Sequence, residues 1–261
     1  MRQSKSMTHN EIKKAASLGS LKFRKKYRQF LVEGVHSVAE LLKSEWQINS
    51  IIVASDAQDH PEIADLLNLS TNRKLQIHTV SGRIFDRIAA TESPQGIVAV
   101  AATPARDMPG VIAQERILIA DHIADPGNLG AMIRCAVAFG FRGIITTPGS
   151  ADIFNPKTVR ASQGALFWIK ISEHATAEEL SERVKPTHKI YALSPKNGAD
   201  IGGISPASRF AIVIGAEAAG ISPELLAISD SMLTIPMAGP TESLNAAVSA
   251  SISMYELSRK R

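Results

Sequence analysis

The chain has 261 residues, and 44% of them are hydrophobic. A chain of this length and composition buries a substantial core and is more typical of two domains than of one. No apolar run approaches the roughly 20 residues that span a bilayer, and the N-terminus lacks the apolar core of a signal peptide. We therefore expect neither membrane insertion nor export, and a cytoplasmic protein.

The cysteine and histidine content gives little support to a metal-dependent mechanism. The single cysteine, Cys135, lies in an apolar run typical of a helix, which excludes a disulfide framework and a zinc cluster built on cysteines. The seven histidines show no close metal-ligand pairing. We therefore expect no metal at the site.

Positive charge is concentrated at the start of the chain. Residues 1–28 hold nine Lys or Arg and one Glu, a net charge of +8, whereas the other 233 residues hold 20 bases and 24 acids, a net charge of −4. Such a segment is expected to meet phosphates. A solubilising, partly disordered tail is the reading that a charge run alone favours. A transit peptide is disfavoured because the run is rich in Lys and contains Glu11.

The first hundred residues predict a small α/β domain, similar to ribosomal-protein-like RNA-binding domains. Its predicted elements are a helix at 35–42, a buried strand at 50–55, a helix at 61–68 and a buried strand at 96–102. Two prolines and a glycine mark 103–110 as a linker. We therefore divide the chain into a basic leader with a substrate RNA-binding domain, residues 1–104, and a second domain, residues 111–261.

Strands and helices alternate in the second domain. We expect strands at 116–121, 143–147, 167–171, 189–194, 210–215 and 232–236, and helices at about 129–139, 157–165 and 176–184, with one long amphipathic helix near the end. The strands are almost continuously apolar, which predicts an α/β fold with a mostly parallel sheet covered on both faces.

Polar and small residues follow two of these strands, where open α/β sheets bind ligands. They are Gly215, Glu217 and Gly220 after one strand, and Ser243 and Asn245 after the other. A dinucleotide-binding domain is disfavoured, because no GxGxxG follows a first strand and GAEAAG (215–220) places a carboxylate where a phosphate would sit.

Three segments resemble the motifs of one family. They are DHIADPGNLGAMIRCAVAFGF (121–141), FAIVIGAEAAGIS (210–222) and LTIPMAGPTESLNAAVSASISMYE (233–256). Their order and spacing are similar to the SpoU (TrmH-type) RNA ribose methyltransferases of the SPOUT class. The resemblance implies S-adenosylmethionine as cofactor, a structured ribosomal or transfer RNA as substrate, a homodimer, and a SPOUT fold with a trefoil knot, an exception to the rule against knots.

The resemblance also implies a cofactor cradle. Backbone groups at Gly215, Ile235 and Leu244 would hold S-adenosylmethionine, and Met237 and Leu193 complete the cofactor-binding candidates. Glycine suits this role because it allows the backbone to approach a ligand closely. The alternative is that Gly215 only ends a strand and Leu244 belongs to the core.

Arg134 interrupts the apolar stretch AMIRCAVAF (131–139). A buried or half-buried arginine without a partner is costly, so the pattern predicts an anionic partner, protein or RNA. The resemblance implies that it activates the ribose 2′-hydroxyl. Because arginine normally stays protonated, stabilising a phosphate or an oxyanion is its minimum role, and general-base action is the bolder one. A structural ion pair with Glu217 is the alternative.

Asn128, Glu217, Ser243 and Asn245 complete the predicted catalytic set. Their amide and hydroxyl groups suit the orientation of a ribose, a phosphate or Arg134, and Glu217 is a candidate to fix that arginine or accept a proton. Each alone is equally typical of a helix cap or a turn residue.

The predicted RNA-binding residues come from two basic segments. They are Lys22, Arg24, Lys25 and Lys26 in the leader, and Lys157 and Arg160 in NPKTVRASQGALF (155–167), which also resembles a family segment. For the second pair, a solvated helix face is the alternative.

The resulting hypothesis is methyl transfer to a ribose 2′-hydroxyl of structured rRNA or tRNA. Two others stay open: a SPOUT methyltransferase that modifies a base, and a non-catalytic RNA-binding or ribosome-assembly factor that kept the fold.

Overall fold

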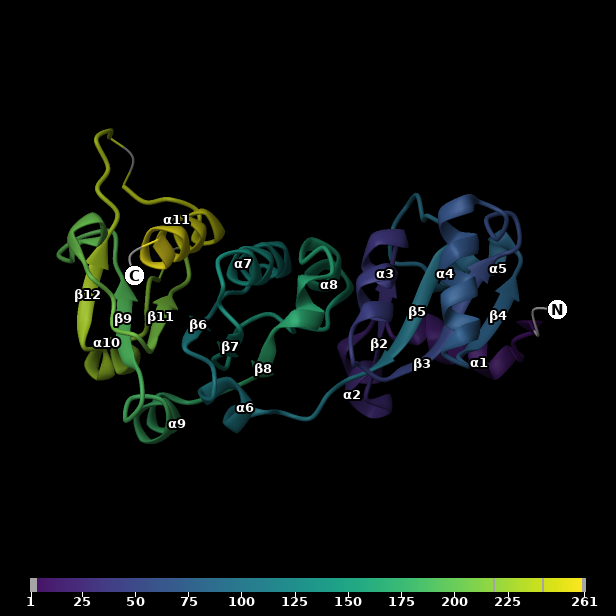
Figure 1. Ribbon diagram of the computed structural model, residues 1–261, viewed down its shortest axis with the longest axis horizontal. Coiled ribbons are helices and arrows are strands. Elements are labelled where there is room, and N and C mark those ends of the chain that lie inside the picture. The colour runs from purple at the N-terminus through teal and green to yellow at the C-terminus, as the bar shows by residue number, and fades with distance from the viewer. Residues whose placement is uncertain (1–3, 218, 241, 260–261) are drawn as a thin grey trace. The chain divides into compact units, whose positions relative to one another are not determined.

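The computed structural model describes residues 4–217, 219–240 and 242–259. The chain divides into two compact units, the first with residues 1–105 and 154–167, the second with residues 106–153 and 168–261. Figure 1 labels most of the helices and strands of both units. Within the described ranges, no helix is long and apolar enough to cross a membrane.

The first unit is built on a mixed five-stranded sheet. Its elements are β1 (Ser4–Lys5), α1 (His9–Ser17), α2 (Leu21–Tyr27), β2 (Gln29–Glu33), α3 (Val35–Lys43), β3 (Ile48–Ala54), α4 (Pro61–Asn72), β4 (Gln76–Val80), α5 (Gly82–Ile88), β5 (Ile97–Ala102) and α8 (Pro156–Ala161). The strand order is β1-β4-β3-β5-β2, with β5 antiparallel to both of its neighbours. The four elements predicted for this part of the chain are confirmed as α3, β3, α4 and β5.

Residues 9–27 of the basic leader contain helices α1 and α2, so the alternative of a disordered tail is wrong for this stretch. A capping box starts α1, in which Thr8 and Glu11 each bind the other's backbone amide. Ile12, Ala15 and Leu18 are buried in an apolar cluster shared with the sheet. These helices were not predicted from the sequence, because their apolar positions are few and are separated by lysines.

Residues 154–167 pack with the first unit, although the sequence places them in the second predicted domain. The ring centroid of Phe154 lies 4.9 Å from that of Phe30 and 6.3 Å from that of Trp46. Phe167 lies 5.4 Å from Trp46 in an edge-to-face arrangement. Four aromatic rings thus bury apolar surface against one another, which stabilises the first unit. The sequence does not indicate this contact, because the rings are far apart along the chain.

The second unit is built on a parallel seven-stranded sheet. Its elements are α6 (Met108–Ile112), β6 (Arg116–Ala120), α7 (Pro126–Ala138), β7 (Gly143–Thr146), β8 (Lys170–Ser172), α9 (Ala177–Arg183), β9 (Lys189–Leu193), β10 (Ala199–Asp200), η2 (Ile201–Gly203), β11 (Phe210–Ile214), α10 (Pro223–Ile228), β12 (Ser231–Thr234) and α11 (Ala246–Arg259). The order is β10-β12-β9-β11-β6-β7-β8, and each neighbouring pair is parallel. The predicted α/β fold with a parallel sheet is confirmed.

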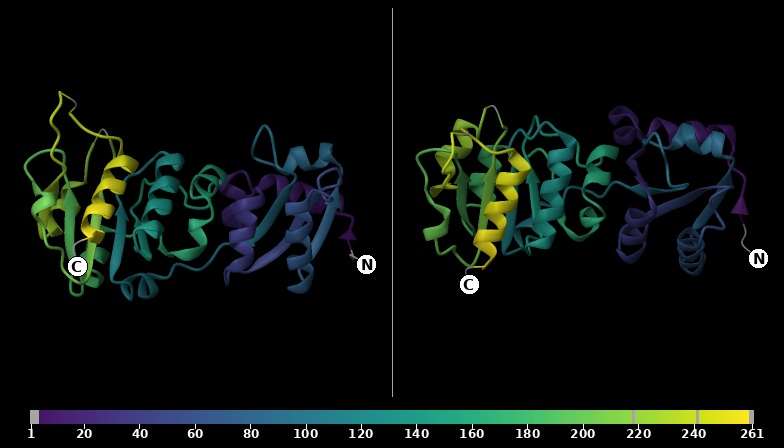
Figure 2. Two further views of the ribbon diagram at one scale, coloured as in Figure 1. Left: turned by 45° about the horizontal axis from the view of Figure 1, so that its top comes forward. Right: turned by 90° about the horizontal axis from the view of Figure 1, so that it is seen from above.

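Helices cover both faces of this sheet. Helices α6, α9 and α10 cover one face, where Val111, Leu180 and Leu225 pack against strand residues such as Ile119 and Val213. Helices α7 and α11 lie side by side on the other face (Figures 1 and 2). This two-sided cover explains why β11 is apolar at every position and β6 is apolar from Ile117 onward.

Two local predictions for this part of the chain are wrong. The strand expected at 167–171 is shorter: a 3-10 turn, η1 (Ala165–Trp168), precedes β8. The linker expected at 103–110 ends early, because α6 begins at Met108 with the Asp107 carboxylate accepting a hydrogen bond from the Gly110 amide.

His188 gives the second unit a pH-dependent stability. Its ring is buried, and its Nε2 donates to the Gln114 carbonyl at 2.8 Å. Burial lowers the pKa of His188 below its ordinary 6.5, and the charge of Arg209 acts in the same direction. The folded protein therefore binds fewer protons than the unfolded chain, so this stabilisation is present above pH 6.5 and is lost as the pH falls below it.

We expect the melting temperature of the wild-type protein to fall between pH 7 and pH 5 more steeply than that of His188→Gln. The glutamine offers a donor to the Gln114 carbonyl but does not titrate. Scanning calorimetry at several pH values makes the comparison, and parallel curves for the two proteins would contradict it.

Candidate active site

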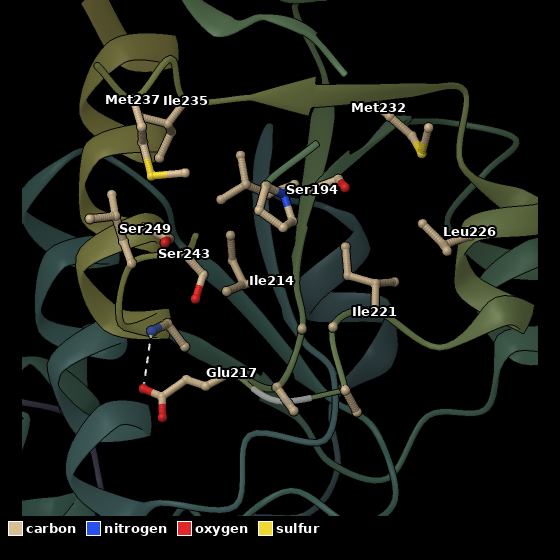
Figure 3. A pocket seen from close by; sticks show the side chains of 18 residues that line it. Ser194, Ile214, Glu217, Ile221, Leu226, Met232, Ile235, Met237, Ser243 and Ser249 are labelled. Carbon is tan, nitrogen blue, oxygen red and sulfur yellow. Dashed lines mark hydrogen bonds between the residues drawn. The ribbon is translucent and has the colours of Figure 1, made fainter. Parts of the chain in front are cut away.

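A cavity of about 380 Å³ lies in the second unit, beyond the carboxyl ends of β9, β11 and β12. Its volume is within the range of small-molecule sites, and parallel sheets bind ligands at this edge. Figure 3 shows the side chains that line it. They come from the ends of these strands, the loops that follow and the start of α11: among them Ser194, Ile214, Glu217, Ile221, Leu226, Met232, Ser243 and Ser249.

All five residues predicted to bind the cofactor line this cavity. They are Leu193, Gly215, Ile235, Met237 and Leu244, from four separate segments of the chain. Of the predicted catalytic set, Glu217 and Ser243 line it as well. The motif spacing therefore predicted which segments meet, and the binding roles of these residues stay a prediction.

Gly215 is required by a close approach of two backbone segments. A Cβ placed on it would lie 2.3 Å from the carbonyl carbon and oxygen of Gly220 and 2.4 Å from the Ile221 nitrogen. The loop turns back here because the Gly220 amide donates to the Ala216 carbonyl at 2.8 Å and Gly220 has a φ of 72°. A side chain at 215 would force this loop, one side of the cavity, to move.

Glu217 joins three elements of the site. Its Oε1 accepts hydrogen bonds from Asn128 Nδ2 at 2.9 Å, from Asn245 Nδ2, and from the Ala246 amide at 3.2 Å. Asn245 Nδ2 also donates to Asn128 Oδ1 at 3.1 Å. The starts of α7 and α11 are thereby held to the loop after β11, and the three predicted residues Asn128, Glu217 and Asn245 form one network.

The alternative interpretation of Asn128 and Asn245 as helix caps is correct for Asn245 and wrong for Asn128. Asn245 Oδ1 accepts from the amides of Ala247 and Val248, so this residue starts α11 as well as binding Glu217. Asn128 is not the cap of α7, because Asp125 accepts from the Asn128 amide at 2.8 Å. The Asn128 side chain is thus available to the network.

Arg134 is exposed on α7, which corrects the expectation of a buried or half-buried side chain. It makes no hydrogen bond or ion pair with any described residue, and the structural ion pair with Glu217 does not form. It is also absent from the residues that line the cavity. Its neighbours Met132 and Ile133 are buried, whereas Arg134 is exposed. An apolar run in the sequence therefore did not indicate that the arginine within it is buried.

Asp121 is a supporting residue that the sequence analysis missed. It ends β6, is fully buried, and accepts hydrogen bonds from the Ser222 amide at 2.7 Å and from Thr147 Oγ1 at 2.8 Å, with His122 Nδ1 also at 2.8 Å. Burial raises the pKa of Asp121, but the bonds from Ser222, Thr147 and His122 outweigh it and hold the pKa below its ordinary value. The carboxylate ties Ser222, at the end of the loop after β11, to the end of β6. An acid that ends an apolar strand was the available signal.

The predicted RNA-binding residues are divided by burial. Lys22, Lys25 and Lys26 are exposed on α2, and Lys157 and Arg160 are exposed on α8.

Arg24 is buried, with 4% of its surface exposed. Its Nη1 donates to the carbonyls of Leu18 at 2.9 Å and Gly19 at 2.7 Å. Because its guanidinium is used to hold α2 to the end of α1, we remove it from the RNA-binding set.

Comparisons with known proteins agree with this geometry. Residues 115–255 match the SpoU rRNA Methylase family, and residues 9–99 match the MRM3-like substrate binding domain. The chain is 35% identical to the "23S rRNA (guanosine(2553)-2'-O)-methyltransferase RlmP" of Bacillus subtilis, over 98% of this chain and 99% of the relative. It is 30% identical to the "23S rRNA (uridine(2479)-2'-O)-methyltransferase" of Streptomyces viridochromogenes, over 94% of this chain and 88% of the relative.

Solved structures are similar over nearly the whole chain. The AdoMet-bound rRNA methyltransferase of Sinorhizobium meliloti has a TM-score of 0.87 at 27% identity and covers 98% of each chain. A TrmH-family protein described as a putative RNA methyltransferase, from Porphyromonas gingivalis, has a TM-score of 0.86 at 30% identity, covering 98% of this chain and all of that one. With a family match across more than half of its length and relatives aligned from end to end, the chain belongs to the SpoU rRNA methylase family.

Proposed function

We propose that this protein transfers the methyl group of S-adenosylmethionine to a ribose 2′-hydroxyl of ribosomal RNA. The observation that carries the proposal is the cavity at the strand ends of a family member, which the second and third family motifs line, while Asn128 of the first motif is bonded to Glu217 at its edge. The two relatives named above are 23S rRNA 2′-O-methyltransferases, which favours rRNA over tRNA as the substrate.

The cavity fits the proposed cofactor chemically. Its apolar residues, such as Ile214, Ile221 and Leu226, suit a purine, and the hydroxyls of Ser194 and Ser243 suit a sugar. The Glu217 carboxylate disfavours a phosphate-bearing nucleotide and favours a ligand with positive charge. When bound, S-adenosylmethionine supplies a methyl group on a positively charged sulfur.

The protein's own groups align and activate the ribose. Methyl transfer forms a carbon–oxygen bond on the ribose as the carbon–sulfur bond breaks, and the hydroxyl proton passes to a base, for which the Glu217 carboxylate is the candidate in the cavity. Holding the hydroxyl in line contributes several kcal/mol, and the network of Asn128, Glu217 and Asn245 keeps the loops rigid for this purpose. In this proposal Ser243 binds the ribose, and Arg134 of a second copy of the chain stabilises the developing negative charge on the ribose oxygen.

Two measurements test this function. The purified protein should bind S-adenosylmethionine without added metal in calorimetry, and mapping of ribose methylation in total RNA from cells with and without the gene should reveal one lost rRNA site. Cofactor binding with loss of a base methylation would instead favour the base-modifying alternative. No cofactor binding, even with RNA present, would favour the non-catalytic RNA-binding factor.

We propose a homodimer that forms through α11. Val248, Ile252 and Tyr255 are 46%, 38% and 47% exposed, and their spacing puts them on one side of the helix. Such a stripe is typical of a surface that a second copy covers. Because α11 packs against α7, Arg134 would lie near this interface and would reach the partner's cavity.

The double substitution Ile252→Glu and Tyr255→Glu should produce monomers, because two charges cannot be buried in an apolar interface without partners. Light scattering after size-exclusion chromatography measures the change. Leu69→Glu, which changes an exposed leucine of the first unit, is the control and should leave the mass unchanged. A monomeric wild-type protein at micromolar concentration would contradict the proposal.

Two further parts of the proposal rest on family membership. The C-terminal segment that forms one side of the cavity would thread through a loop to make the trefoil knot. The cytoplasm, where rRNA is available, would be the compartment.

The lysines of α2 should carry part of the RNA affinity. Each phosphate contact contributes roughly 0.7–0.9 to the slope of log affinity against log salt concentration. Replacing Lys22, Lys25 and Lys26 with Gln should therefore weaken RNA binding and flatten this slope, while cofactor affinity stays unchanged. Deleting residues 1–28 would be a poor test, because it removes buried side chains of α1.

The matched control replaces three exposed lysines of the second unit: Lys170, Lys185 and Lys189. It changes the net charge equally, so it separates a local contact from a general charge effect. Equal salt slopes for the two variants would show that α2 is a solvated helix and would direct attention to Lys157 and Arg160.

A further inference from the structure

Two aromatic rings lie one helical turn apart on α2, within the basic leader. Phe23 and Tyr27 are stacked, with ring centroids 6.1 Å apart and ring planes 15° apart. Both side chains are half-buried, so part of each ring is accessible. Residues four apart lie on the same side of a helix, so the two rings form one surface, which we name the aromatic platform.

Three lysine ammonium groups surround the aromatic platform. Lys14 and Lys26 lie 4.9 Å and 5.3 Å from the centroid of the Tyr27 ring, and Lys22 lies 5.9 Å from that of Phe23. At exposed sites such cation–π contacts contribute only about 0.5–1 kcal/mol, so an anion displaces the lysines easily.

In the part of the chain that the structure describes, no acidic side chain is paired with these lysines. The only acid among residues 1–28 is Glu11, and its carboxylate is bound to the amide and hydroxyl of Thr8. Among the described residues, none of Lys14, Lys22 and Lys26 forms an ion pair. The surface therefore offers accessible aromatic area with positive charge on its rim.

The aromatic platform is held rigidly from behind. Tyr27 packs against the apolar cluster that contains Leu18 and Leu31. The buried Arg24 binds the carbonyls of Leu18 and Gly19, which fixes α2 to the end of α1. A surface fixed in this way loses little conformational entropy when a ligand binds.

We propose that the aromatic platform stacks an unpaired base of the RNA, while Lys14, Lys22 and Lys26 move onto the flanking phosphates. Unpaired nucleotides combine a flat apolar face with negative charge, and proteins bind them with aromatic rings set among lysines or arginines. A duplex hides its base faces, and an acidic peptide supplies charge without them. The inference rests on the proposed function and extends it, because it predicts a single-stranded element in the substrate RNA.

The test uses Phe23→Leu and Tyr27→Leu in the full chain, which keep apolar bulk and all charges. The probes are a ten-nucleotide single-stranded RNA with a central 2-aminopurine and the same RNA paired with its complement. Each substitution should weaken single-strand binding about tenfold, because stacking on one ring contributes roughly 1–3 kcal/mol. Duplex affinity and the salt slope should not change. The 2-aminopurine fluorescence should fall on binding to the wild-type protein and fall less with either variant.

Two controls keep the outcome interpretable. Tyr27→Phe retains the ring and should bind like the wild type, whereas Leu21→Ala removes exposed apolar area from the same helix and should have no effect. Phe23 lies outside the apolar cluster, so its variant tests the proposal even if Tyr27→Leu lowers the melting temperature. Unchanged single-strand affinity in Phe23→Leu, or equal losses for single strand and duplex, would overturn the proposal. These assays contain no cofactor, so they separate this proposal from the proposed catalytic function.

Discussion

Gly215→Val should abolish S-adenosylmethionine binding, with the dissociation constant raised at least about 100-fold, which corresponds to roughly 3 kcal/mol of overpacking. The reason is a collision within the protein. The first carbon of any side chain at 215 would lie 2.3 Å from the Gly220 carbonyl, so the loop that holds Glu217 must move away. Valine at 215 is therefore expected to displace one side of the cavity.

Calorimetry with S-adenosylmethionine measures this loss directly. Gly203→Val is the matched control, because no atom lies within 4 Å of a Cβ added at Gly203. Gly215→Ala should already weaken binding, since the clash begins at Cβ. Wild-type affinity in Gly215→Val would show that the loop after β11 does not contact the cofactor.

Arg134→Ala should lower the rate of methyl transfer about 10²–10³-fold, the usual cost of removing one group that stabilises a developing oxyanion. Cofactor affinity and the melting temperature should stay near wild type, because the side chain is exposed, makes no bond with the described residues and does not line the cavity. Single-turnover kinetics with saturating RNA separates the chemical step from binding. Equal losses of rate and cofactor affinity would contradict the proposed role.

A mixture of two inactive variants tests whether Arg134 acts in the partner's site. In a heterodimer of Arg134→Ala and Gly215→Val, the first subunit keeps an intact loop and the second keeps an intact arginine. If each cavity uses the arginine of the other subunit, the cavity of the Arg134→Ala subunit is complete. If the site is shared, equal mixing should restore roughly a quarter of wild-type activity, because half of the dimers are mixed and one of their two sites is complete. If Arg134 serves its own cavity, no mixed dimer contains a complete site, and activity would stay absent.

Much of the fold could be predicted because parallel strands covered on both faces must be apolar throughout. Strand β11 shows this pattern over its whole length and β6 shows it from Ile117 onward, which led to the prediction of a parallel sheet. Helices α1 and α2 were not predicted, because charged residues dominate their sequences. The packing of residues 154–167 with the first unit was not predicted, because it depends on aromatic contacts with Phe30 and Trp46, which are more than 100 residues away in the chain.

The sequence predicted which segments form the site better than it predicted the roles of individual side chains. Motif spacing indicated that Gly215, Ile235 and Leu244 come together, and they line one cavity. Burial of single polar residues was harder to predict. Arg134 is exposed and Arg24 is buried, the reverse of what their neighbours in the sequence suggested, because helix orientation decides which side faces the core.

The hydrogen bond between Asn128 and Asn245 spans 117 positions of the chain. Because the start of α11 is held by this bond and by Glu217, the cavity lacks one side without this helix. A variant cut after residue 244 would keep every strand of the parallel sheet but would lose that side. Such a variant would therefore fold its sheet and yet be unable to hold cofactor.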